Sequence, residues 1–222
     1  MQTQTAVVLG GTGLIGSLLT TQLLNDAAFG TVRLLVRRPI EFTHPKLDVQ
    51  LVDFNNLADY ENKLGKGDCL FCCIGTTQKN VKGDNTAYRK IDFDIPVNAA
   101  NIAEREGFNT YLLVSAIGAN AGAGNFYLQL KGEVENAVKA AGIKSVYIFQ
   151  PSMLLGKRNE RRIAERIIQP IMKSLSFLFV GTIKKYKAIQ ASDVAKSMVA
   201  CAKNKEDGVH VLSYEKIMQS QK

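Results

Sequence analysis

The sequence predicts an α/β protein with a doubly wound parallel sheet that carries helices on both faces. Three observations lead to this prediction: short apolar segments alternate with amphipathic ones, a glycine-rich turn follows the first apolar segment, and no repeat or linker interrupts the alternation. The composition, with 46% hydrophobic and 22% charged residues, is that of an ordinary globular protein. We therefore expect a single domain over residues 1–222 with a small C-terminal extension.

The first part of the chain alternates between strand and helix patterns. Residues 5–10, TAVVLG, are apolar and β-branched and predict a strand, and residues 13–27 predict a helix because leucines recur at helical spacing. Residues 31–37 and 47–53 predict the second and third strands, separated by a loop that contains two prolines. Residues 56–64 predict the next helix.

The alternation continues through the middle of the chain. Three more strands are predicted, at residues 68–75, 110–118 and 145–151. Further helices are predicted at residues 95–107, 126–142 and 190–204. Ser192 or Asp193 is the expected N-cap of the last of them. The last 70 residues otherwise predict helix-rich structure.

Charge and hydropathy narrow the class of protein. The net charge of +8 suits nucleic acid, an anionic membrane or a ligand that carries phosphate. The basic clusters lack interleaved aromatic residues, so nucleic-acid binding is not expected. A helix that crosses a bilayer needs roughly 18–20 apolar residues, and no apolar run in this sequence approaches that length. The N-terminus lacks the pattern of a signal peptide. We expect a cytoplasmic protein without stable membrane insertion.

The cysteines offer two interpretations. Cys69 and Cys72 form a C-x-x-C pattern, which a redox pair or a zinc site would use. However, they lie with Cys73 in a predicted buried strand, and no histidine has suitable spacing to complete a zinc site. Packing of reduced thiols in the core is the favoured interpretation, and Cys201 is the fourth cysteine. No metal site is expected.

The turn after the first strand, GGTGLIG, predicts a phosphate-binding loop. It follows a strand, opens a helix and lies in a βαβ unit of about 30 residues, which is the context that this glycine pattern requires. Glycines permit the tight turn and the close approach of a pyrophosphate, and the helix N-terminus offers N–H groups to it. The expected dinucleotide-binding residues are Gly10, Thr12, Gly13, Leu14, Ile15 and Gly16.

The end of the second strand indicates which dinucleotide binds. Proteins that bind a cofactor with a free ribose 2′-hydroxyl usually have an acidic residue there, which accepts a hydrogen bond from that hydroxyl. This chain has Arg37 and Arg38 instead. A guanidinium suits a 2′-phosphate, so NADP(H) is favoured over NAD(H). The alternative is that both arginines only flank the strand end in solvent.

Further cofactor contacts are expected at the ends of the third and fourth strands. Asp53 and Phe54 lie where a side chain could reach the adenine, although Asp53 as N-cap of the following helix is an equally good interpretation. Ile74 and Gly75 end the fourth strand, and Gly75 permits the backbone to approach the dinucleotide.

Three residues predict carbonyl or alcohol chemistry. Tyr127 and Lys131 are spaced by one helical turn, and Ser115 ends the fifth strand twelve residues before Tyr127. A tyrosine with a pKa near 10 is a poor acid or base at neutral pH unless a nearby ammonium lowers that pKa. The serine hydroxyl can orient and polarise the substrate oxygen.

These segments together resemble the short-chain dehydrogenase/reductase family, in its atypical branch of Tat-interacting-protein-like oxidoreductases. The resemblance runs almost end to end, over GGTGLIG, RLLVRRP, VDFNNLADY, FCCIGTT, YLLVSAIGAN, NFYLQLKGEVE and FQPSMLLGKRNERR. It implies a Rossmann fold, NADP(H) as cofactor, and Ser115, Tyr127 and Lys131 as a catalytic triad. It also implies that Lys131 bonds the nicotinamide ribose and that Leu154 and Arg162 lie over the nicotinamide end.

One residue departs from the family pattern. Many members of the family place an asparagine on the helix after the fourth strand, linking a proton-relay water to the lysine, and this chain has Asp92. A carboxylate can hold a water, but its charge also competes for Lys131. Slow turnover is therefore expected, and some members of this branch are expected to serve as NADPH-binding sensors.

The substrate side is the least informative part of the sequence. Residues 116–124 are nearly all small and predict a mobile pocket rim without specificity. Residues 151–190 are expected to form a cap that completes the pocket for a small carbonyl or alcohol. Within it, the spacing of apolar residues over 160–179 predicts a basic amphipathic helix that Pro170 would kink. Three roles for this segment are considered: it packs on the domain or on a second subunit, it forms a lid, or it contacts an anionic membrane. A homodimer or protein partner is compatible with it.

Overall fold

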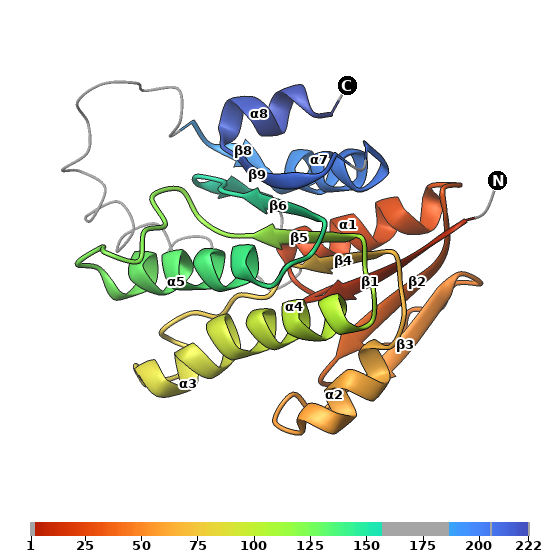
Figure 1. Cartoon of the computed structure of the whole chain (residues 1–222), viewed down its shortest axis with the longest axis horizontal. Coiled ribbons are helices and arrows are strands. Elements are labelled where there is room, and N and C mark those ends of the chain that lie inside the picture. The colour runs from red at the N-terminus through yellow and green to blue at the C-terminus, as the bar shows by residue number, and fades with distance from the viewer. Residues whose placement is uncertain (1–2, 157–186, 205, 222) are drawn as a thin grey trace.

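The computed structural model describes residues 3–156, 187–204 and 206–221. Its centre is a seven-stranded, all-parallel sheet with the order β3-β2-β1-β4-β5-β6-β9 (Figure 1). The strands are β1 Gln4–Leu9, β2 Phe29–Val36, β3 Leu47–Leu51, β4 Cys69–Cys72, β5 Thr110–Val114, β6 Ser145–Phe149 and β9 Gly208–Leu212. A separate two-stranded ladder joins β7 Leu154–Leu155 to β8 Ile189–Gln190.

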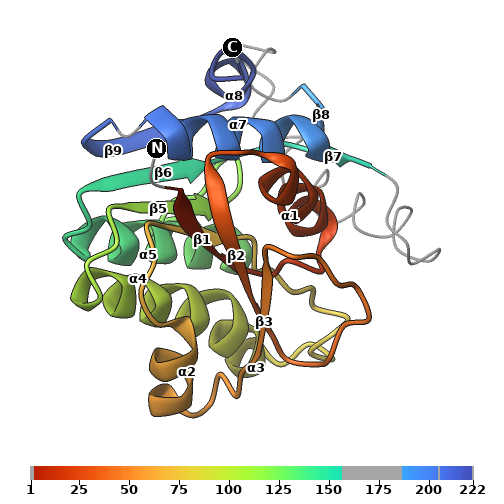
Figure 2. The same ribbon diagram turned by 90° about the vertical axis from the view of Figure 1, so that its right-hand side faces the viewer.

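Helices cover both faces of this sheet, so the predicted doubly wound, Rossmann-like fold is confirmed (Figure 2). One apolar core lies between the sheet and α1, α7 and α8, and the other lies between the sheet and α2, α4 and α5. The helices are α1 Leu14–Asn25, α2 Leu57–Leu64, α3 Asn85–Arg89, α4 Ile95–Arg105, α5 Phe126–Ala140, α7 Ala191–Asn204 and α8 Tyr214–Gln219. A π-helical turn, η1 Lys90–Asp94, joins α3 to α4.

The strand order reverses between β1 and β4. From β1 the chain adds β2 and then β3 on one side, and from β4 it adds β5, β6 and β9 on the other. In open α/β sheets, ligands bind outside the carboxyl ends of the strands at such a reversal. Two predicted strands were too long at this edge. Residues 73–75 and 115–118, predicted as strand, are loops that follow β4 and β5.

One C-terminal strand was not predicted from the sequence. The last 70 residues were expected to be helix-rich, and their described part contains the helices α7 and α8, but Gly208–Leu212 also adds β9 to the edge of the sheet beside β6. Only one of its five residues, Leu212, is buried, and the other four are exposed or half-buried, so its sequence signal is weak. The predicted cap of the last helix was also wrong, because α7 begins at Ala191 and both Ser192 and Asp193 lie inside its first turn.

The two cysteines of the C-x-x-C pattern lie on opposite faces of the sheet. Cys69 packs in the core beneath α1 and α7, and Cys72 packs in the core beneath α4 and α5. Three residues apart on a strand, their side chains point in opposite directions and cannot form a joint site. Burial also raises the pKa of the Cys72 and Cys73 thiols, which disfavours the reactive thiolate. The core-packing interpretation is confirmed for this pair.

Within the described ranges, no helix has both the length and the apolar character needed to cross a bilayer.

Candidate active site

The glycine turn joins the carboxyl end of β1 to α1 at the strand-order reversal. Gly10 has φ +74°, and a Cβ there would lie 2.7 Å from the backbone C and O of Cys73, at the end of β4. A Cβ on Gly16 would lie 2.1 Å from the Gly10 carbonyl oxygen, so α1 can pack this closely only with glycine. Both glycines are therefore required by the fold itself.

Gly13 leaves the start of α1 open to a ligand. It is the N-cap, with its own N–H donating to the Gly10 carbonyl at 2.9 Å, and a glycine cap supplies no side-chain acceptor for the following N–H groups. Those N–H groups carry the positive end of the helix dipole. Thr12 is exposed, Leu14 is half-buried, and Ile15 is buried in the core. The side chain of Ile15 therefore serves packing.

Arg37 and Arg38 are exposed directly after β2. Among the described residues, neither guanidinium has an ion-pair or hydrogen-bond partner. By contrast, Arg33 on the same strand is bound to Asp48 at 2.6 Å. The two arginines thus lie at the carboxyl edge of the sheet with their donors available to an anion.

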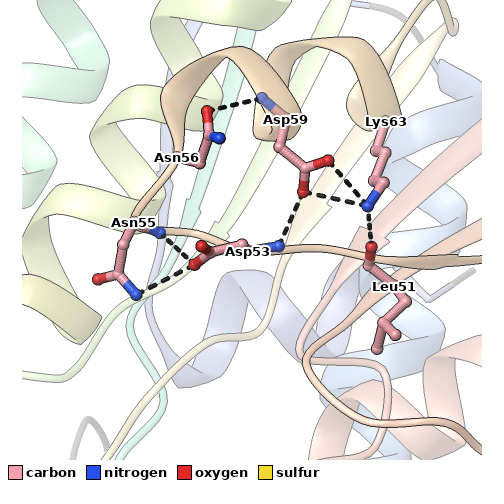
Figure 3. A network of polar contacts seen from close by, with 6 residues as sticks. All are labelled: Leu51, Asp53, Asn55, Asn56, Asp59 and Lys63. Atoms are coloured by element: carbon pink, nitrogen blue, oxygen red, sulfur yellow. Dashed lines mark hydrogen bonds and ion pairs between the residues drawn. The ribbon is translucent and has the colours of Figure 1, made fainter.

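Asp53 and Phe54 follow β3 at the same edge, and Figure 3 shows the polar contacts of Asp53. The Asp53 carboxylate accepts hydrogen bonds from the backbone and side chain of Asn55, at 3.0 and 3.1 Å. The interpretation of Asp53 as a helix cap is wrong, because Asn56 caps α2 by accepting from the Asp59 N–H at 3.1 Å. Asp59 in turn accepts from the Asp53 N–H at 2.9 Å, which holds the exposed Asp53 in place.

Ile74 and Gly75 follow β4 and lead to a buried carboxylate. The Asp92 Oδ1 accepts a hydrogen bond from the Thr76 N–H at 2.7 Å, and a Cβ on Gly75 would lie 3.9 Å from Asp92 Oδ2. The Tyr88 hydroxyl donates to the Thr76 carbonyl at 3.0 Å. The loop after β4 is therefore fastened to α3 and η1. The π-helical turn carries Asp92, as such turns often do at functional sites.

Asp92 and Lys131 form a buried ion pair. The Lys131 Nζ lies 2.9 Å from Asp92 Oδ2, and the two side chains are only 7% and 1% exposed. Burial alone lowers the pKa of Lys131, but the Asp92 carboxylate and Tyr127 outweigh burial, and the pKa is raised overall. The lysine is therefore cationic, and the expected competition for its charge is present in the structure.

Tyr127 lies on the same face of α5 as Lys131. The Lys131 Nζ is 6.0 Å from the centroid of the Tyr127 ring, and Asn125 caps the helix by accepting from the Tyr127 N–H at 3.0 Å. Burial raises the pKa of Tyr127, Lys131 lowers it, and Asp92 raises it further. The net pKa is above the ordinary value, because burial is the largest of the three influences and Asp92 acts in the same direction.

Ser115, directly after β5, has its hydroxyl engaged by a residue that sequence reasoning missed. The hydroxyl donates to Glu135 Oε1 at 2.5 Å, and the Gln150 amide donates to both oxygens of Glu135, at 2.9 and 3.1 Å. Glu135 is buried, at 4% exposure, and the Lys139 Nζ lies 3.7 Å from it. A usable signal was present, since Tyr127, Lys131 and Glu135 are each four residues apart and share one helix face.

The loop of small residues between β5 and α5 is tied down at several points. The Ile117 N–H donates to the Pro151 carbonyl at 3.0 Å, and the Asn120 N–H donates to the Leu128 carbonyl at 3.0 Å. A Cβ on Gly132 would lie 2.1 Å from the Ala121 nitrogen, so this loop packs directly on α5. These contacts hold the loop against α5 and the end of β6, and its mobility stays a prediction.

The C-terminal side of the site is described in part. Leu154 lies in β7 and packs against the core beneath α1, and a Cβ on the nearby Gly156 would lie 3.0 Å from the Leu14 side chain. This segment therefore runs beside the start of α1. Arg162 and the expected helix of residues 160–179 lie outside the described residues. A cavity of about 530 Å³ opens at the carboxyl ends of β6 and β9, bordered by Ile117, Gln150, Ser213 and Lys216 among others.

Comparison with known families and proteins adds a second line of evidence. A family described as NAD(P)H-binding matches residues 10–205. The protein HTATIP2 of Rattus norvegicus is 31% identical over 178 residues, which are 79% of this chain and 73% of that protein. The mitochondrial protein FMP52 of Debaryomyces hansenii is 32% identical over 200 residues, 89% of this chain and 87% of that protein.

Solved structures share the fold at lower identity. MoeE5 in complex with UDP-glucose and NAD superimposes with a TM-score of 0.70 at 17% identity, covering 98% of this chain and 80% of that one. The Bordetella bronchiseptica enzyme WbmH in complex with NAD+ gives a TM-score of 0.73 at 15% identity, covering 96% and 76%. These likenesses concern the fold alone.

Proposed function

The chain belongs to the NAD(P)H-binding family, as an atypical relative of the short-chain dehydrogenase/reductases, and from that premise we propose that it is an NADP(H)-dependent oxidoreductase. The proposed reaction transfers a hydride between the nicotinamide and a small carbonyl or alcohol. The observation that carries the proposal is the joint position of Tyr127 and Lys131. They share one face of α5, beside the strand-order reversal where this fold binds its ligands.

The residues at the sheet edge fit a dinucleotide. The glycine turn leaves space that a Cβ would fill, and the open N-terminus of α1 suits a pyrophosphate. Arg37 and Arg38 are unpaired within the described residues and suit a 2′-phosphate, which supports NADP(H) over NAD(H). Asp53, Phe54, Ile74 and Gly75 border the same edge, and Leu154 lies near its α1 side.

In the proposed mechanism, bound nicotinamide supplies or accepts the hydride. Tyr127 donates a proton to the substrate oxygen in reduction and removes it in oxidation. Lys131 stabilises the phenolate that Tyr127 becomes when it donates, and the same lysine is available to the nicotinamide ribose. Since Ser115 donates to Glu135, its hydroxyl must turn away from that carboxylate before it can donate to a substrate carbonyl.

A second candidate function is that of an NADPH-binding sensor with little turnover. The ion pair between Lys131 and Asp92 favours it, because a lysine held by a carboxylate at 2.9 Å lowers the pKa of Tyr127 less than an unpaired lysine would. Such a sensor would act through a protein partner or a second copy of the chain. Binding of NADPH without reduction of any carbonyl would identify it.

The two candidates separate in one experiment on the wild type and Tyr127→Phe. Calorimetric titration with NADPH and NADH measures binding, and the oxidation of NADPH over a panel of aldehydes, ketones and quinones measures turnover. An enzyme loses turnover in Tyr127→Phe and keeps NADPH affinity. Turnover that persists in Tyr127→Phe refutes the role of Tyr127, and equal affinity for NADH and NADPH refutes the role of Arg37 and Arg38.

We further propose that the protein acts in the cytoplasm. The fungal relatives are named as mitochondrial proteins, so the mitochondrion is the alternative compartment. Fractionation of cells that express the chain with a C-terminal tag separates the two. Recovery in the mitochondrial fraction would refute the cytoplasmic assignment.

A further inference from the structure

The buried charges around Lys131 have an unequal balance. The cluster holds one buried ammonium, that of Lys131, and two buried carboxylates, those of Asp92 and Glu135, whose oxygens face only donors. Asp92 is paired with the lysine at 2.9 Å, which leaves Glu135 with the neutral donors of Ser115 and Gln150. Among the described residues, Lys139 lies within ion-pair distance of Glu135, at 3.7 Å, and its side chain is 34% exposed. Counted over the described residues, the buried part of the cluster therefore holds one more carboxylate than ammonium and is net negative.

This cluster lies on one side of the strand-order reversal. Asp92 is bound beneath the loop that follows β4, and Glu135 is bound to Ser115 and Gln150, which follow β5 and β6. The glycine turn follows β1 and the two arginines follow β2, on the other side. A dinucleotide with its pyrophosphate at the turn and its 2′-phosphate at the arginines therefore extends its nicotinamide toward the cluster.

The two redox forms of the nicotinamide differ in charge. The oxidised ring carries a positive charge and the reduced ring is neutral, whereas the phosphates are the same in both forms. Buried charges are weakly screened, so they act on the ring more strongly than charges at the surface do. We propose that Asp92 and Glu135 determine specificity for the redox form of the cofactor, favouring NADP+ over NADPH at this site.

This inference depends on the proposed function, because it assumes that the cofactor binds. Under this inference Glu135 has two roles. It positions the Ser115 hydroxyl, and it contributes negative charge near the nicotinamide. The consequence for chemistry is a bias toward alcohol oxidation. With its hydroxyl donated to Glu135, Ser115 offers only acceptor lone pairs to the cleft, which suit a substrate alcohol better than a carbonyl.

The test measures binding and needs no substrate. Calorimetric titration gives the Kd of NADP+, NADPH and 2′-phospho-ADP-ribose, which lacks the nicotinamide, for the wild type, Asp92→Asn, Glu135→Gln and the double variant. We expect the ratio of the NADPH Kd to the NADP+ Kd to fall about tenfold in the double variant. Each single variant should move the ratio in the same direction. The Kd of 2′-phospho-ADP-ribose should stay unchanged, which reports an intact adenine half of the site.

Matched controls remove the same charge nearby at the surface. Glu133→Gln acts on the same helix as Glu135, where Glu133 pairs with Arg89, and Asp94→Asn acts on the same π-helical turn as Asp92, where Asp94 is exposed. Both should leave the ratio unchanged. An unchanged ratio in the double variant, or an equal change in the controls, overturns the inference and leaves the proposed function standing. Failure of the wild type to bind either nucleotide overturns the proposed function itself.

Discussion

The buried ion pair makes a quantitative prediction for stability. In Lys131→Met, the Asp92 carboxylate stays buried at 1% exposure without the ammonium that lies 2.9 Å from it. Removing one partner of a buried pair costs about 3–5 kcal/mol, because the remaining charge is left uncompensated. For a domain of this length, that loss lowers the melting temperature by on the order of 10 °C.

The assay is urea unfolding followed by circular dichroism, with a rescue variant and a surface control. In Lys131→Met/Asp92→Asn, the neutral amide still accepts from the Thr76 N–H, so about half or more of the lost stability should return. Lys144→Met removes a lysine that lies 3.6 Å from Asp207 with both side chains more than 60% exposed, and it should cost about 1 kcal/mol or less. If Lys131→Met costs no more than Lys144→Met, or if Asp92→Asn fails to rescue it, the buried pair does not hold the site as described.

Two further predictions follow from the glycine turn and from the pKa of Tyr127. Gly16→Ala should destabilise the fold by at least about 2 kcal/mol, since its Cβ would lie 2.1 Å from the Gly10 oxygen, whereas Gly124→Ala meets nothing within 4 Å and should be nearly neutral in the same urea assay. In alcohol oxidation Tyr127 must lose its proton, and its raised pKa places the rising limb of the pH–rate profile at high pH. Asp92→Asn removes an influence that raises this pKa, so the limb should shift to lower pH. A shift to higher pH would contradict that sign.

The fold was predictable because its signals are local. Apolar β-branched segments alternate with leucine-rich helices, and the glycine turn identifies the βαβ unit before any tertiary information is available. The strand β9 was missed because four of its five residues are exposed or half-buried at the sheet edge, and the segment forms a strand by pairing with β6. Strand pairing of this kind depends on tertiary contacts, which cannot be predicted from the sequence of a short segment.

The candidate site was predictable in its residue types and only partly in its contacts. The spacing of Tyr127 and Lys131 follows from helix geometry, and the structure places both on one face of α5. The direction of the Ser115 hydroxyl could not be read from the sequence, because it depends on Glu135 and Gln150, which come from a helix and a strand end distant along the chain. Similarly, Asn56 rather than Asp53 caps α2, because which of these neighbouring residues becomes the cap depends on the backbone conformation.

The position of Lys131 between two partners explains why a tyrosine and a lysine one turn apart do not by themselves define an active base. The ammonium lies 2.9 Å from the Asp92 oxygen and 6.0 Å from the centroid of the Tyr127 ring, so its Coulomb interaction is stronger with the carboxylate. At the Tyr127 phenol, the opposite charges of Lys131 and Asp92 nearly cancel. Burial therefore dominates and raises the pKa of Tyr127. Proton transfer therefore depends on how firmly Asp92 is held. The Thr76 N–H holds it at 2.7 Å from the loop that follows β4, so a ligand that moves this loop would also change the pKa of Tyr127.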